Sequence, residues 1–180
     1  FTEAVMYIWI GCDISPRFTE FREKIIALSD ELGLDKTVFN FPQHISLKIV
    51  FDTEEEIAKH CIKDIIELLK AEKPFTVKIT DMERREGIIW LKTEQHERLK
   101  YLHEELDEIG KSYAVKPDKL DKEFIFHTTL AMDGDETKLD EAYEKLQGIP
   151  YPDEVKINTF LVAHSTDKVN FKVDRRIKVK

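Results

Sequence analysis

The sequence contains few cysteines, glycines and prolines, and it has no long apolar run. Its two cysteines, Cys12 and Cys61, lie far apart and form no CxxC pair, a usage typical of reduced thiols. Six glycines and six prolines exclude a collagen-like or low-complexity chain. No apolar stretch approaches the ~20 residues of a membrane span, and the apolar segment Val5–Ile10 lacks the preceding basic residues of a signal peptide. We therefore expect a cytoplasmic protein with no membrane partner.

Basic residues are in the minority. The 28 lysines and arginines against 36 aspartates and glutamates give a net charge of −8. Proteins that coat long duplex nucleic acids usually have a basic face, so this balance argues against such a role. A small phosphate ligand needs only a few local donors and stays allowed. Apolar residues make up 42% of the chain, which is enough for a core. At ~150 residues per domain, residues 1–180 predict one domain, and we expect a monomer.

Short β-branched and aromatic runs alternate with amphipathic segments. Ser15 before Pro16 predicts the N-cap of one helix, and a capping box of Thr53 and Glu56 predicts the start of another. This mixture predicts an α+β sheet protein. The expected strands are Ala4–Asp13, His44–Phe51, Pro74–Met82, Gly87–Thr93, Phe124–Met132, Val155–His164 and Asn170–Val179, and the expected helices are Ser15–Leu32, Ile57–Leu69, Glu94–Tyr113 and Asp135–Leu146.

One tetrapeptide pattern occurs twice, on two of these strands. Residues 44–47 read His-Ile-Ser-Leu, and residues 127–130 read His-Thr-Thr-Leu. Two such matches are expected by chance roughly 0.001 times in a chain of this composition. In each half a helix and two further strands follow. The repeat predicts two intertwined, pseudo-symmetric lobes, from approximate halves 1–90 and 91–180, that face each other across a groove.

Strand alternation predicts where the motif side chains point. In the first motif His44 and Ser46 share one face, and in the second His127 and Thr129 do. The intervening apolar residues must face the core, so both imidazoles and both hydroxyls would face the common groove. For a single histidine, an ordinary surface position would be the better interpretation. The pairing favours a site.

Two further residues are candidates for substrate binding. Lys48 shares the face of His44 and Ser46, so it could hold a phosphate or be a solvated strand lysine. Trp9 on the first strand could stack on a nucleobase or pack in the core. The sequence has no His and carboxylate spacing of the zinc type, and we expect neither a metal nor a cofactor.

With these motifs in place, the chain resembles the 2H phosphoesterase superfamily, which includes the 2'-5' RNA ligase-like (LigT-like) cyclic phosphodiesterases. The resemblance rests on PQHISLKIVF at residues 42–51, FIFHTTLAM at 124–132 and GIIWL at 87–91, and it covers the whole chain. It implies a bilobal α+β duplication in which antiparallel sheets are flanked by helices. It further implies that His44 and His127 are catalytic and that Ser46 and Thr129 bind phosphate.

These residue types suit the opening of a cyclic phosphodiester. One imidazole can activate water while the other protonates the leaving oxygen, because the pKa of histidine lies near neutrality. Hydroxyls two residues further along can donate to the non-bridging oxygens.

The leading prediction is thus a metal-independent enzyme that opens a 2',3'-cyclic nucleotide or a related ribose cyclic phosphate. Two alternatives stay open. One is 2'-5' RNA ligation, or cleavage of a 2'-5' or cyclic oligonucleotide, with a short RNA as partner. The other is a non-catalytic module that binds nucleotides.

Overall fold

The computed structural model describes residues 5–113, 115 and 124–180, and of residues 49–51 it describes the backbone only. Ala4, which the sequence assigns to the first strand, lies outside this part of the chain. The described elements are β1 (Val5–Asp13), α1 (Ser15–Leu32), the 3₁₀ helix η1 (Thr37–Asn40), β2 (His44–Glu54), α2 (Glu55–Lys70), β3 (Phe75–Arg85), β4 (Ile88–Thr93), α3 (Glu97–Ser112), β5 (His127–Met132), α4 (Glu136–Leu146), β6 (Glu154–Ile157), β7 (Thr159–Ser165) and β8 (Lys172–Lys178).

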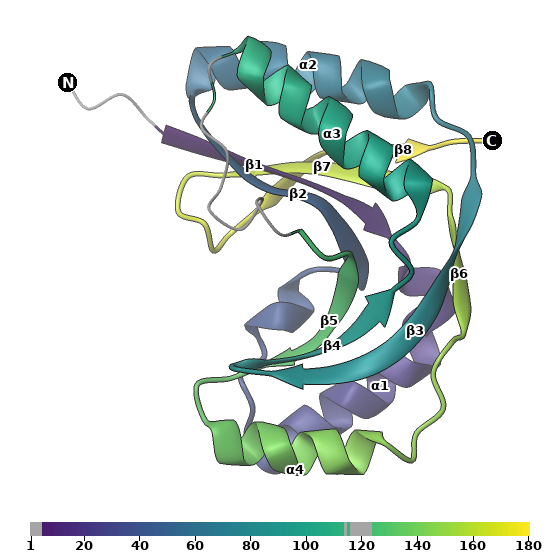
Figure 1. Cartoon of the computed structure of the whole chain (residues 1–180). Helices are drawn as coiled ribbons and strands as arrows, with labels where there is room; N and C mark the ends of the chain where they lie inside the picture. The colour runs from purple at the N-terminus through teal and green to yellow at the C-terminus, as the bar shows by residue number, and fades with distance from the viewer. Residues whose placement is uncertain (1–4, 114, 116–123) are drawn as a thin grey trace.

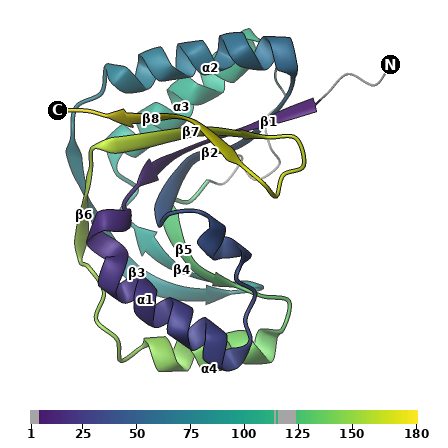
Figure 2. The same cartoon turned by 180° about the vertical axis from the view of Figure 1, so that it is seen from behind.

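The strands form two four-stranded antiparallel sheets. One sheet has the order β2-β1-β7-β8 and the other β5-β4-β3-β6. Figure 1 shows the sheets one above the other, with α2 and α3 on the outer side of the first and α1 and α4 on the outer side of the second. Figure 2 shows the same four layers from behind. The predicted α+β architecture of two lobes is confirmed.

Each sheet takes strands from both halves of the chain, so the lobes are intertwined. After α4 the chain passes from the second sheet to the first at Asn158, which separates β6 of the second sheet from β7 of the first. The sequence predicts one continuous strand over Val155–His164, and that prediction is wrong at this residue. β6 alternates between exposed and buried residues, and β7 is almost entirely buried. Both patterns are typical of strands, so the sequence alone does not show that β6 and β7 belong to different sheets.

The predicted helix starts are wrong in detail. The helix α1 begins at Ser15 itself, and the carboxylate of Asp13 accepts from the Ser15 amide at 2.9 Å. Thr53 does not cap α2, because β2 continues through Glu54 and leaves no free turn before the helix. Its hydroxyl instead lies 3.5 Å from the Glu54 carbonyl oxygen.

Within the two tetrapeptide motifs, residues 44–47 and 127–130, the alternation is as predicted. Ile45 and Leu47 of β2 are fully buried, as is Leu130 of β5. The polar residues between them, His44, Ser46, His127 and Thr129, are only partly buried. The apolar residues anchor each strand in the core, and this anchoring turns the motif imidazoles and hydroxyls towards the space between the sheets.

Candidate active site

The two motifs are joined by a buried glutamine. Gln43 precedes His44, and its amide nitrogen donates to the Thr128 hydroxyl at 2.5 Å and to the Thr129 carbonyl at 2.7 Å. The amide oxygen of Gln43 accepts from Arg22 at 3.2 Å. These bonds connect the start of β2 directly to β5, so residues 85 positions apart in the chain lie side by side.

Both histidines are held by the same local hydrogen bond. His44 Nδ1 lies 2.8 Å from the carbonyl oxygen of Pro42, and His127 Nδ1 lies 2.7 Å from that of Ile125. A carbonyl oxygen only accepts, so Nδ1 carries the proton in each ring. The other nitrogen, Nε2, is therefore the one left for proton transfer, and in a neutral ring it is basic.

Burial keeps both imidazoles uncharged. Desolvation lowers the pKa of His44 to about 4, against the partial support of the Pro42 carbonyl, and the charge of His127 lowers it further. Desolvation also lowers the pKa of His127, and the nearby Arg85 adds to that effect. The free protein thus holds two neutral imidazoles at neutral pH.

Trp9 lies beside the first motif and orients it. Its indole N–H donates to the Ser46 hydroxyl at 3.0 Å, and its ring meets that of His44 edge-on, with centroids 4.8 Å apart. The tryptophan is only 7% exposed and packs with Leu161 and Ala163. Of the two interpretations from the sequence, packing is the one seen, and the ring offers no open face for a base. The Ser46 hydroxyl keeps its own proton for donation to a ligand.

Lys48 differs from the expectation of a phosphate ligand. Its side chain is 0% exposed, and its ammonium lies 3.3 Å from the carboxylate of Asp107 on α3. The helix α3 packs along β2 and covers this position. The pairing of β2 with β1 shifts register between Ser46 and Lys48, so the alternation breaks there and Lys48 lies on the face that α3 covers, opposite to His44 and Ser46.

The second motif has a support that the sequence analysis missed. The Trp90 ring on β4 stacks on His127, with centroids 4.0 Å apart, and the Arg85 guanidinium lies 4.6 Å from the Trp90 centroid. Glu83 pairs with Arg85 at 3.0 Å. Trp90 lies directly opposite Thr129 in the ladder, and its buried indole N–H has no hydrogen-bond partner among the described residues. Each motif histidine is thus in contact with a tryptophan from the neighbouring strand.

A cavity of about 390 Å³ opens between the sheets at the motifs. We call it the His44 cavity. Its walls come from η1, β2, β5 and the segment between β7 and β8, and it contains one cation, Lys168. The residues that line it are Thr37, Val38, Phe41, His44, Thr129, Met132, Lys168 and Val169. His44 and Thr129, from the two different motifs, therefore face one cavity with a largely apolar wall.

Other features bear on the chemistry that this part of the chain supports. No group of three or more His, Cys, Asp or Glu side chains among the described residues is placed to hold a metal ion. Cys12 and Cys61 are buried free thiols, and burial raises the pKa of each. No helix within the described residues is long and apolar enough to span a membrane.

Comparison with known proteins identifies a family. The model of the 2'-5' RNA ligase superfamily matches residues 7–168. Two curated relatives, each described as a "Putative phosphoesterase", are 29% identical over 119 residues in Geobacillus thermodenitrificans and 32% identical over 110 residues in Bacillus licheniformis. These matches cover 63% and 59% of this chain, and 66% and 62% of the relatives' own length.

Solved structures share the whole fold. Escherichia coli LigT complexed with 3'-AMP superposes with a TM-score of 0.62 at 16% identity, covering 98% of this chain and 99% of LigT. The protein TT0787 of Thermus thermophilus has a TM-score of 0.61 at 14% identity, covering 96% of this chain and 97% of its own. At such identities the likeness concerns the fold, and it agrees with the resemblance drawn from the two motifs.

Proposed function

This chain belongs to the 2'-5' RNA ligase superfamily, and we propose that it is a phosphoesterase that opens a ribose cyclic phosphodiester by two-histidine acid–base catalysis without a metal. The observation that supports this most is the matched pair of Nδ1 hydrogen bonds. Both His44 and His127 leave Nε2 for proton transfer, and both come from strands that Gln43 joins. An isolated surface histidine would need no such fixation.

The reaction needs one neutral and one protonated imidazole. One histidine takes a proton from water as the water oxygen bonds to phosphorus, and the other gives a proton to the ribose oxygen as its bond to phosphorus breaks. The substrate carries a negative charge, which favours the protonated form of a nearby imidazole. Substrate binding would therefore draw one proton into a site that is uncharged when empty.

Within this proposal we give each histidine a role that its surroundings support. His44 is the ring whose pKa is depressed furthest, to about 4, so it is the harder one to protonate and the better candidate for the base. His127 then acts as the acid. The Ser46 and Thr129 hydroxyls each lie two residues beyond a histidine on the same strand face. They would donate to the non-bridging oxygens and stabilise the charge of the transition state.

The His44 cavity suits a small nucleotide. Its volume of about 390 Å³ lies within the range of ~300–1,000 Å³ usual for small-molecule sites. Phe41, Met132 and Val169 offer apolar contacts for a base and ribose. Solved LigT structures contain 3'-AMP and NADP+, which are also nucleotides.

The test is turnover of a panel of 2',3'-cyclic nucleotides, followed by phosphorus NMR. We expect one phosphomonoester product, undiminished activity in EDTA, and a loss of at least ~10²-fold in His44→Ala and in His127→Ala. Ser46→Ala and Thr129→Ala should each cost less than either histidine change. Near-normal turnover in a histidine variant would overturn the mechanism. Inertness towards the whole panel, with joining or cleavage of 2'-5' linked RNA, would favour the ligase alternative. Tight binding without turnover would favour a nucleotide-binding module.

A further inference from the structure

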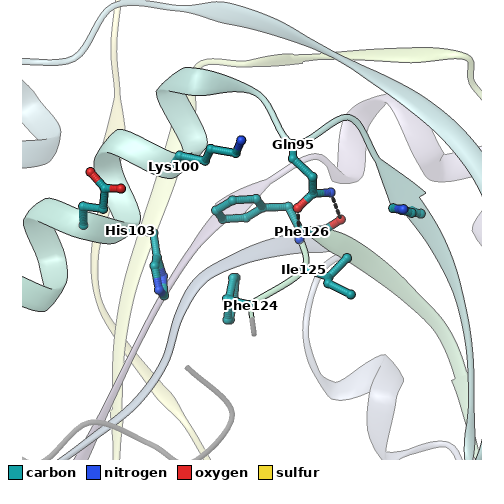
Figure 3. Close-up of a pocket in the computed structure, with 8 residues that line it drawn as sticks. Gln95, Lys100, His103, Phe124, Ile125 and Phe126 are labelled. Carbon is teal, nitrogen blue, oxygen red and sulfur yellow. Dashed lines mark hydrogen bonds between the residues drawn. The ribbon is translucent and has the colours of Figure 1, made fainter. Parts of the chain in front are cut away.

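A second cavity, of about 350 Å³, lies at the start of β5 (Figure 3). We call it the Phe124 cavity. Figure 3 shows His103 projecting from α3 towards Phe124, and Gln95 hydrogen-bonded to the backbone of Phe126. The residues that line the cavity are Lys92, Gln95, Lys100, His103, Glu104, Phe124, Ile125 and Phe126.

This cavity shares a wall with the second motif. Lys92 is the direct partner of His127 across the β4–β5 ladder. Ile125, another lining residue, supplies the carbonyl that holds His127 Nδ1. Thr129 lines the His44 cavity, so His127 stands between the two cavities along the chain. The pairing of Lys92 with His127 therefore places the Phe124 cavity beside this histidine.

The lining combines aromatic rings with unpaired cations. The rings of His103 and Phe124 stack with centroids 4.6 Å apart, and the His103 Nδ1 is fixed by the Leu47 carbonyl at 2.6 Å. Neither Lys92 nor Lys100 makes an ion pair within the described residues, and Glu104 is the only acidic residue of the lining. In a protein with a net charge of −8, two lysines that have no ion pair among the described residues and lie beside an aromatic pair are a local departure.

Aromatic platforms beside cationic side chains are the usual means of holding single-stranded nucleic acid. Bases stack on the rings, and the cations contact the phosphates. We propose that the Phe124 cavity binds a second nucleotide, the neighbour of the one whose phosphate reacts. The base stacks on the Phe124–His103 pair, and Lys92 and Lys100 take its phosphate. This subsite depends on the proposed function above, and with it the preferred substrate is the end of a short oligonucleotide rather than a mononucleotide.

Binding tests the subsite without turnover. The probes are 3'-AMP and the diadenylate that carries the same terminal 3'-phosphate, titrated into the whole protein by calorimetry. We expect the dinucleotide to bind about five- to 150-fold more tightly, the gain expected for one stacked base. Phe124→Ala should remove most of that gain. Lys92→Met and Lys100→Met should each reduce it, and each should lower the slope of log Kd against log salt by about 0.7 if it loses one phosphate contact.

Lys63→Met is the matched control, because Lys63 is an exposed lysine on α2 that lines neither cavity. It should leave the ratio of the two dissociation constants unchanged. Equal binding of the two probes would overturn the subsite, and so would a dinucleotide gain that the Phe124 and lysine variants leave intact. A protein that prefers the dinucleotide but opens no cyclic phosphate would keep the subsite and refute the proposed function. Turnover of cyclic mononucleotides without any dinucleotide preference would do the reverse.

Discussion

The depressed pKa of His44 predicts that mild acid destabilises the folded protein through this one side chain. In the folded state the pKa of His44 is about 4, whereas in an unfolded chain the pKa of histidine is ~6.5. Between these values the unfolded chain binds the proton and the folded protein does not. The free energy of unfolding therefore falls as the pH falls through this window, and above pH ~7 His44 contributes no pH dependence.

The magnitude follows from the two pKa values. At pH 5 the linkage relation gives a loss of about 2 kcal/mol relative to pH 8, and the loss approaches about 3 kcal/mol below pH 4. This is a large part of the ~5–15 kcal/mol that usually separates folded from unfolded protein. His127, whose pKa is also lowered, adds a loss of the same sign.

Urea denaturation of the wild type and of His44→Gln at pH 8 and pH 5 isolates the contribution of His44, because the other groups largely cancel in the difference. The wild type should lose about 2 kcal/mol more than the variant between these two pH values. Inorganic phosphate should reduce this excess loss, since an anion between the rings favours their protonated forms. A difference below about 0.5 kcal/mol, or one of opposite sign, would show that His44 is not held neutral by burial, and the assignment of His44 as the base would fail with it.

Two further predictions concern the tryptophans. A Cβ at position 11 would overlap the Trp9 ring, so Gly11→Ala should displace the ring. We expect this variant to lose ~1–3 kcal/mol of unfolding free energy, measured by calorimetry, and to turn over substrate more slowly in the phosphoesterase assay. Gly148 has open space around it, so Gly148→Ala should change neither the stability nor the turnover. Arg85→Met removes a positive charge that lowers the pKa of His127, so the pKa of His127 should rise in this variant. NMR titration of the His127 ring measures this pKa, and an unchanged or lower value would contradict the role given to the Arg85–Trp90 stack.

The motif residues could be predicted because their signal is local. Alternation over four residues gives the face of His44 and Ser46, and buried Ile45 and Leu47 enforce it. The same reasoning failed for Lys48, because the β1–β2 register shifts between Ser46 and Lys48 and turns this lysine to the face that α3 covers, where it meets Asp107. The catalytic and phosphate-binding roles themselves stay predictions, since they depend on measured activity.

The supports of the site were missed for a related reason. Trp90 stacks on a histidine 37 positions later, and Arg22 reaches Gln43 from another element. No periodicity within one segment encodes such pairs. One signal was nevertheless present for Gln43. Alternation places this residue on the apolar face of β2, where a polar side chain must find hydrogen-bond partners, and the amide could have been read as a link between elements.

The two motifs are alike in their chemistry and different in their surroundings, and under the proposed mechanism this difference would let one ring act as the acid and the other as the base. The Nδ1 bond to a carbonyl two residues earlier gives both rings the same tautomer. Around His44 desolvation is the largest effect, and the charge of Arg22 also disfavours the protonated ring. Around His127 desolvation and the charge of Arg85 also lower the pKa, and Glu83 opposes them in part. A perfect duplication would give two equal imidazoles competing for one proton. Under the proposed mechanism, the different residues behind the two rings would separate their proton affinities and so set the direction of proton transfer.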